Sequence, residues 1–386
     1  MNSLEQLRTV KRADVWKQDA HVATLVRKED GGVTFAYLPG YAGPPVAKSL
    51  PVVDGGVDSQ GGALPAFFTG LLPEGHRLSV IRKLVKTSLD DELSLLLAIG
   101  NDLPGDVRVV PTGTKPVPPV QQGEPGDLDF QTLTETVETQ GLAGVQGKAS
   151  ASMINTPLTI GRGDYILKLS SAEYPQLVEN EHLHLQHAAK LGIPVAQSQL
   201  VQDRNGVSGL LVQRFDRYGG RRLPLEDATQ ILNIPPSQKY NVTAEEVTQA
   251  LAEVTAQPRI AVRTLYLQLV FAWLTGNGDC HAKNISVVQN VAGNWEVAPM
   301  YDIPCTAVYR DFTLALTVNG KTKNLRARDW DAFAESISLP LKAAHGANEI
   351  ALTVASGINL AEIPVEGSAL YGAERELRFR RSQLEP

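Results

Sequence analysis

The stretch of residues 266–274 constrains the fold most, because it is apolar around nearly the whole circumference of a helix. A helix without a polar face has to be enclosed by other elements on all sides. Gly276 follows it and predicts where the helix ends. Burying such a helix requires a sizeable core, which a chain of 386 residues can build in two or three domains.

Immediately after this helix the sequence becomes densely polar. The segment LTGNGDCHAKNISVV packs two Asn, an Asp, a His and a Lys into eight residues between the end of a helix and the start of a strand. Beyond Asn277, these are Asp279, His281, Lys283 and Asn284. A tight turn requires little more than Asn and Gly. The additional polar groups therefore indicate a functional loop.

A hairpin is predicted directly after this loop. The runs ISVVQ and WEVAPM alternate around the turn residues 290–294. In an antiparallel hairpin the start of the first strand lies beside the end of the second. We therefore expect Asn284 and Asp302 to lie together, with Asp279 one short loop away. Oxygen ligands of this kind suit Mg²⁺, which keeps waters and phosphate oxygens as its remaining ligands.

The spacing from Asp279 to Asn284 is also that of the catalytic loop of protein kinases. In that loop the Asp orients or deprotonates the attacking hydroxyl, the Asn holds metal, and a later Asp binds Mg²⁺. Upstream, the strand DYILKLSS carries Lys168, which is placed to neutralise phosphates. Glu181 or Glu179, on the next helix, could hold this Lys by an ion pair.

Each of these features has a simpler explanation when it stands alone. An isolated Asp-x4-Asn pair is usually a solvated turn, and a strand-end Lys usually extends its charge to solvent. A Gly-rich stretch such as residues 141–147 is usually a flexible loop. Their order along the chain, from Gly-rich stretch to final Asp, favours a kinase over coincidence.

The chain divides into four predicted regions. Residues 1–110 form a β-rich subdomain that contains the hairpin pattern HVATLVRKEDGGVTFAYL. Residues 111–127 are rich in Pro and Gly and form a predicted linker. Residues 128–222 form a kinase N-lobe-like, ATP-binding region, and residues 223–386 a helical C-lobe with the catalytic loop and the metal-binding Asp.

Composition narrows the class of protein. A net charge of −6 argues against direct, nonspecific binding to a nucleic-acid backbone. Two cysteines cannot build a disulfide framework and suit a reducing cytosol. The N-terminus lacks the apolar core of a signal peptide, and no run approaches membrane-spanning length. We expect a cytoplasmic protein.

Two other candidate sites carry less weight. His182, His184 and His187 share one predicted helix, but without matching Cys or carboxylate partners we expect surface or half-buried histidines. Cys280 has only His281 nearby as a base, so a Cys nucleophile is not expected.

Several motifs together resemble those of the HipA family, the toxin kinases of HipA–HipB toxin–antitoxin modules. They are GNGDCHAKNISV, MYDIP, LVQRFDR, RLPLEDATQIL and LLPEG, in the same order over nearly the whole chain. The resemblance implies an α+β fold: a divergent, two-lobed protein-kinase-like fold with an extra N-terminal β-rich subdomain and a mostly helical C-terminal lobe. It also implies a serine/threonine kinase that uses ATP and Mg²⁺.

The resemblance further implies partners and roles for single residues. Family members bind a small helix-turn-helix antitoxin dimer, reach DNA only through it, and phosphorylate glutamyl-tRNA synthetase. The implied catalytic-loop residues are the base Asp279, with His281 and Lys283, and the metal ligands Asn284 and Asp302. The implied nucleotide-binding residues are Lys168 with Glu181, the hinge residues Gln213, Phe215 and Asp216, and the phosphate-loop residues Gly144, Val145, Gln146 and Lys148.

The phosphate loop departs from the family pattern at its usual autophosphorylation site. A Ser commonly stands where this chain has Gly141, and an acidic residue often stands where it has Gly147. Gly141 has no hydroxyl, so self-silencing there is impossible. The nearby hydroxyls are Thr139, Ser150 and Ser152, and we expect none of them to take over that role.

Two alternative functions stay open. One is a small-molecule kinase of the aminoglycoside-phosphotransferase type, against which the separate N-terminal region and its LLPEG stretch argue. The other is a weakly catalytic co-repressor that binds antitoxin. Against it stands the complete set of Lys168, Asp279, Asn284 and Asp302, because a scaffold needs none of them.

Overall fold

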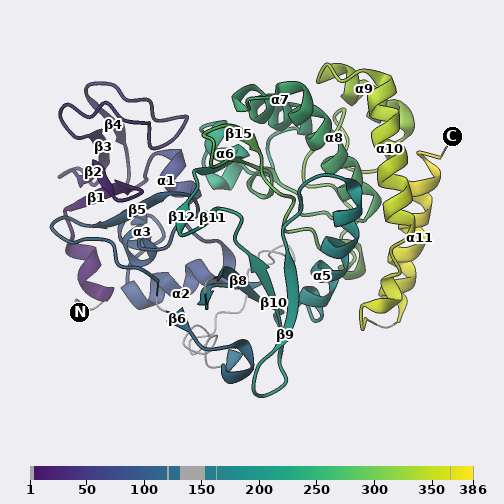
Figure 1. Ribbon diagram of the computed structural model, residues 1–386, viewed down its shortest axis with the longest axis horizontal. Helices are drawn as coiled ribbons and strands as arrows, with labels where there is room; N and C mark the ends of the chain where they lie inside the picture. Colours follow the sequence, from purple (N-terminus) through teal and green to yellow (C-terminus); the bar gives the residue numbers. More distant parts are fainter. Residues whose placement is uncertain (1–3, 120, 131–152, 162, 366, 386) are drawn as a thin grey trace.

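The N-terminal elements and the C-terminal helices lie at opposite ends of the long axis of the molecule, with a second sheet between them (Figure 1). This arrangement comes from a computed structural model. It describes residues 4–119, 121–130, 153–161, 163–365 and 367–385.

The N-terminal unit, as we call residues 4–111, is built on an antiparallel sheet with strand order β4-β3-β2-β1-β5. The predicted hairpin is confirmed as β2 and β3. A separate hydrophobic core, drawn from residues between Leu7 and Val109, fills the unit. Its elements are η1 (Leu4–Thr9), β1 (Arg12–Lys17), β2 (Ala20–Arg27), β3 (Val33–Tyr37), β4 (Gly56–Ser59), α1 (Ala66–Gly70), α2 (Gly75–Val85), α3 (Glu92–Ile99) and β5 (Val107–Pro111).

A second sheet, the central sheet, has the order β6-β7-β8-β10-β9, and only β6 pairs in parallel. Its strands are β6 (Gln121–Gln122), β7 (Ile154–Ile160), β8 (Gly163–Leu169), β9 (Ser198–Gln202) and β10 (Ser208–Gln213). The predicted linker, residues 111–127, thus supplies β6, followed by η2 (Pro125–Asp127). The division of the chain into domains stays a prediction.

Helix α5 (Leu177–Ala188) packs against the central sheet. On α5 and the short helical turn that follows it, Val178, Leu185, Ala188 and Leu191 are all buried. Gly192, at a φ of 73°, ends the segment.

The expectation that all three α5 histidines lie at or near the surface is wrong for His184. This side chain is fully buried, while His182 and His187 are partly exposed. The reason is tertiary, because Leu274 and Leu377 close over the same small space as His184. Burial lowers the pKa of His184 to about 4, so its ring is neutral at pH 7.

The predicted all-apolar helix is α8 (Pro258–Leu274), and its residues from 264 onward are buried. Tyr266 stacks on Phe333, and Trp273 packs against Trp330. The helices around it and beyond it are α6 (Ala228–Ile231), α7 (Ala244–Val254), α9 (Ala327–Ser336), α10 (Leu341–Ser356) and α11 (Ser368–Ser382). Across the described residues, none of the helices combines the length and apolar character that crossing a membrane requires.

The second predicted hairpin is confirmed as β14 (Ser286–Gln289) and β15 (Trp295–Val297). A third strand, β13 (Leu225–Asp227), pairs with the other edge of β14. The expectation of mostly helical structure from residue 223 missed this strand, because three residues carry too little pattern to predict it. The resulting sheet, with the order β13-β14-β15, begins its central strand directly after the polar loop that follows α8.

Candidate functional site

A cavity of about 330 Å³ lies where the N-terminal unit, the central sheet and the segment after α8 meet. This volume is in the range of small-molecule sites. The predicted site residues that line it are Lys168, Gln213, Phe215, Asp216, His281, Lys283, Asn284 and Asp302. The N-terminal unit adds residues 70–74, Arg77, Ile99, Asp102 and Pro104 to the lining.

The residue directly before the polar loop, which comprises residues 277–284, stands at a position that requires glycine. Gly276 has a φ of 71°, and a Cβ on it would lie 2.9 Å from the Ala307 Cβ. The Thr306 N–H donates to the Gly276 carbonyl at 2.8 Å. The end of α8 is thereby fixed against the segment that follows Asp302.

Hydrogen bonds within the polar loop hold its shape. The side-chain oxygen of Asn277 accepts from the Asp279 N–H at 3.0 Å, and the Asn284 amide donates to the Asp279 carbonyl at 2.8 Å. Asp279 is completely buried, whereas Asn284 faces the cavity. The hairpin delivers Asp302 to the same cavity.

Lys168 on β8 is the centre of a buried ion-pair cluster. Its ammonium group donates to both oxygens of Glu181 at 2.7 and 2.9 Å, and also to Asp302. The partner from α5 is thus Glu181 and not Glu179. Burial alone would lower the pKa of Lys168, but Asp302 and Glu181 outweigh it and raise the pKa. The lysine is therefore a permanent cation.

Asp302 has a φ of 59°, a region that residues with side chains rarely adopt. Such backbone strain persists only where the surrounding structure enforces it, and it concentrates at functional sites. The carboxylate of this residue contacts Lys168 and lines the cavity.

Tyr240 was not predicted from the sequence, although it contacts the buried Asp279. Its hydroxyl donates to the Asp279 Oδ1 at 2.7 Å, and its ring packs edge-on against His281. Burial and the charge of Asp279 raise the pKa of Tyr240, so the hydroxyl keeps its proton. Burial, with Lys239 nearby, lowers the pKa of His281 to about 3, which leaves that ring neutral.

Glu74, just before α2, is a second residue that the sequence did not assign to the site. Its carboxylate pairs with Lys283 at 3.4 Å and also with Lys239. Lys283 further donates to the Gly70 carbonyl at 3.0 Å. Burial would raise the pKa of Glu74, but Lys283 and Lys239 lower it to about 2. The signal was present in the LLPEG stretch, which supplies Glu74.

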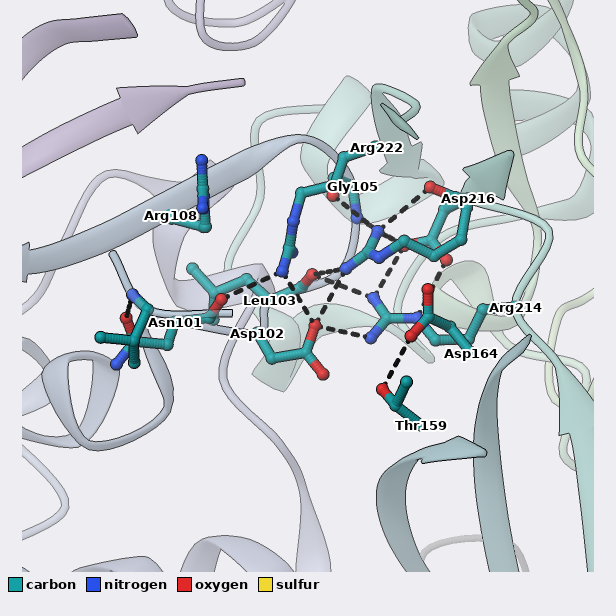
Figure 2. A network of polar contacts seen from close by, with 12 residues as sticks. Asn101, Asp102, Leu103, Gly105, Arg108, Thr159, Asp164, Arg214, Asp216 and Arg222 are labelled. Carbon is teal, nitrogen blue, oxygen red and sulfur yellow. Dashed lines mark hydrogen bonds and ion pairs between the residues drawn. The ribbon is translucent and has the colours of Figure 1, made fainter. Parts of the chain in front are cut away.

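A second charged cluster joins the N-terminal unit to the exit of β10 (Figure 2). Asp216 accepts from Arg214 at 2.9 and 3.0 Å, from Arg217 at 2.7 Å, and from the Gly105 N–H at 2.8 Å. Asp102 accepts from the same two arginines and from Arg222. The Asp216 oxygens are thus occupied by protein donors, and a ribose hydroxyl would have to share them.

The other residues predicted to form the hinge differ in their surroundings. The Gln213 side chain is exposed at the end of β10. The Phe215 ring packs at a tilt on Tyr301, with 5.4 Å between ring centroids. An apolar surface therefore lies beside the hinge backbone.

Several predicted positions lie outside the described residues. These are Gly144, Val145, Gln146 and Lys148, together with Thr139, Gly141, Gly147, Ser150 and Ser152. Within the described ranges, His, Cys, Asp and Glu side chains do not gather in groups of three or more that could hold a metal. Cys280 is buried, which raises the pKa of its thiol to about 12 and argues against a nucleophile.

Proteins similar to this chain in sequence include two bacterial relatives. Y4mE of Sinorhizobium fredii, named as a candidate kinase, is 28% identical over 372 residues, which cover 86% of this chain and 88% of that protein. The serine/threonine-protein kinase toxin HipA of Shewanella oneidensis is 26% identical over 340 residues, or 78% of this chain and 76% of that protein.

A solved structure shows the same fold. It is the complex of Shewanella oneidensis HipA with HipB and operator DNA, and its HipA chain matches with a TM-score of 0.76 at 20% identity. The match covers 96% of this chain and 95% of that one. The predicted α+β, two-lobed, kinase-like fold with an extra N-terminal subdomain is thereby confirmed.

Two family models match this chain. The HipA N-terminal domain matches residues 13–110, and the HipA-like C-terminal domain matches residues 140–358. The second match alone covers more than half of the chain. The protein therefore belongs to the HipA family.

Proposed function

We propose that the protein is an ATP-dependent serine/threonine protein kinase that acts as the toxin of a toxin–antitoxin module. The observation that carries this proposal is the buried pair of Lys168 and Glu181, which opens through Asp302 onto the cavity. A strand Lys held by a helix Glu is the arrangement that protein kinases use to grip nucleotide phosphates. Phosphoryl transfer depends mainly on such positioning and on compensation of charge.

The residues where the Lys168–Glu181 pair meets the cavity fit a magnesium ion. The Asp302 side chain keeps 20% of its surface exposed, whereas Glu181 keeps none, so only Asp302 can exchange a lysine contact for a ligand. Asn284 lines the same cavity and offers an amide oxygen. We assign Asp302 and Asn284 as the residues that hold Mg²⁺, which neutralises charge on the phosphate oxygens when bound.

Asp279 is the proposed general base. The hydroxyl of Tyr240 fixes one of its carboxylate oxygens, and hydrogen bonds from Asn284 and to Asn277 fix its backbone. A base held in one orientation can accept the proton of a substrate hydroxyl as the phosphorus–oxygen bond forms. The neutral His281 and the Glu74-bound Lys283 complete the loop, and we assign them supporting roles.

The proposed partners follow from the relatives. A toxin HipA is a relative of this chain, and the solved HipA structure contains HipB and operator DNA. We propose that this chain binds a HipB-like helix-turn-helix dimer in the cytoplasm and reaches DNA only through it. The proposed substrate is a translation component such as glutamyl-tRNA synthetase.

Transfer of labelled γ-phosphate tests the kinase assignment. Purified protein with Mg²⁺ and ATP should label a serine or threonine of its target, and Asp279→Asn or Asp302→Ala should each lower the rate ~10²–10⁴-fold. Circular dichroism should show that both variants stay folded. Turnover within twofold of wild type in either variant would contradict the assigned site.

Phosphoproteomics distinguishes the possible substrates. Cells that express the active protein should gain a phosphosite that cells expressing Asp279→Asn lack. Phosphate found only on a small molecule would favour the aminoglycoside-phosphotransferase type. No phosphate transfer, together with antitoxin binding, would favour the co-repressor.

A further inference from the structure

The N-terminal unit supplies one wall of the cavity, and α2 carries two charged side chains on that wall. Glu74 precedes the first residue of α2, and Arg77 follows three positions later; both line the cavity. Residues three apart lie on one face of a helix. Because Glu74 contacts Lys283 of the polar loop, the first turn of α2 lies beside the loop that carries the proposed base.

Arg77 differs from the other cations that line this cavity. Lys168 pairs with Glu181 and Asp302, Lys283 pairs with Glu74, and Arg214 pairs with Asp216. Within the described part of the chain, Arg77 is the lining cation that makes neither a hydrogen bond nor an ion pair. Burial lowers its pKa to about 10, since the more distant Asp102 only partly compensates.

The surroundings of Arg77 carry a local excess of positive charge. Arg214, Arg217 and Arg222 share the carboxylates of Asp102 and Asp216. Two carboxylates cannot neutralise these three guanidinium groups and also Arg77. Arg77 is half-buried and faces the cavity, and its guanidinium group keeps its charge at physiological pH, so it can receive an anion that enters the cavity.

We propose that Arg77 belongs to the binding site for the phosphate chain of the nucleotide and is supplied by the N-terminal unit. This assignment rests on the proposed kinase function. Adenine and ribose are uncharged, whereas the phosphate chain is the anionic part of ATP. The planar guanidinium fork matches phosphate oxygens with two parallel hydrogen bonds. The N-terminal unit thus takes a direct part in nucleotide binding.

Affinities for adenosine, AMP, ADP and ATP test this assignment in the full chain with Mg²⁺ present. Arg77→Ala should weaken ATP and ADP binding about 10- to 100-fold, the effect of one charge-assisted hydrogen-bonded contact, and change adenosine binding less than twofold. Arg77→Lys should recover part of the loss, because it restores the charge but not the fork. Arg82→Ala is the matched control, since Arg82 lies on the same helix without lining the cavity.

The outcomes separate this assignment from the kinase proposal. Wild-type protein that binds none of the four ligands would overturn the proposed function itself. Wild-type protein that binds ATP, with Arg77→Ala binding it equally well, would overturn only the role of Arg77. An equal loss of affinity for adenosine and ATP would show that Arg77 only shapes the wall of the cavity. A loss confined to the KM of the protein substrate would show that Arg77 recognises an acidic side chain. Either result would overturn the assignment.

Discussion

Two buried charge clusters border the same cavity but pair their charges to different degrees. In the Lys168 cluster one lysine is shared by Glu181 and Asp302, and the Asp302 side chain keeps 20% of its surface exposed. In the Asp216 cluster the carboxylate is 5% exposed and already accepts from Arg214, Arg217 and a backbone N–H. The Asp302 carboxylate can therefore be offered to a ligand, whereas the Asp216 carboxylate cannot.

The Lys168 cluster is therefore suited to chemistry, and the Asp216 cluster to holding distant segments of the chain together. A partly exposed carboxylate can exchange its lysine for a metal ion at little cost in desolvation. The Asp216 cluster instead links segments that are more than 100 residues apart in sequence, such as those of Asp102 and Arg214. Three predictions test this comparison.

The largest expected effect is on folding. Asp216→Ala should lower the free energy of unfolding by about 3–5 kcal/mol, because it removes the most buried of the carboxylates that pair with the buried Arg214 and Arg217. Urea denaturation of the full chain measures this change. Asp19→Ala removes a fully exposed partner of Arg108 and should leave the unfolding midpoint unchanged. Equal stability of the two variants would remove the distinction between the clusters.

The second prediction concerns catalysis in the Lys168 cluster. Lys168→Met should lower kcat about 10²–10³-fold, as expected for loss of one preorganised donor to the transferring phosphate. Stability should change less than in Asp216→Ala, since Glu181 can take up a proton when its lysine is gone. Single-turnover kinetics and urea denaturation together test this. A variant that unfolds easily yet retains kcat would reverse the roles of the two clusters.

The smallest expected effect is a dependence of stability on pH, which arises from the bridge that Glu74 forms with Lys283 and Lys239. The pKa of Glu74 is lowered from its usual 4.5 to about 2 by Lys283 and Lys239. A lowered folded pKa means that the bridge stabilises the fold above pH 4.5 and loses that contribution as the pH falls toward 2. The contribution should be at most about 3 kcal/mol.

Denaturation of wild type and Glu74→Gln at several pH values measures this contribution. The stability difference should be largest near pH 7 and shrink steadily below pH 4.5. A difference that is independent of pH would show that the carboxylate charge is irrelevant. Glu92→Gln is the control within the N-terminal unit, because Glu92 bonds to Leu64 and Thr69 and does not line the cavity.

Much of the fold and part of the candidate site could be predicted from local sequence. The hairpin of β14 and β15 joins strands only five residues apart, so alternation and turn residues were sufficient to predict it. That hairpin predicted that Asn284 and Asp302 would lie together, and both residues line the same cavity. Strand β13 was missed because it is only three residues long and its partner β14 lies about 60 residues away in sequence.

The sequence by itself determined the features that depend on neighbours along the chain. The apolar residues of α8 required burial, Gly276 ended the helix, and the spacing from Asp279 to Asn284 fixed a loop of one size. These features follow from helix and strand periodicity and from the backbone freedom of glycine. They are therefore readable without a partner segment.

Only the tertiary structure decided which distant groups meet. It chose Glu181 over Glu179 for Lys168, placed Tyr240 on Asp279, and brought Glu74 to Lys283 across more than 200 residues of chain. Charge pairing depends on distance and burial in space, and neither follows from residue type or spacing. The tertiary structure also decided that the N-terminal unit contributes to the site, because burial leaves each charge with few possible partners.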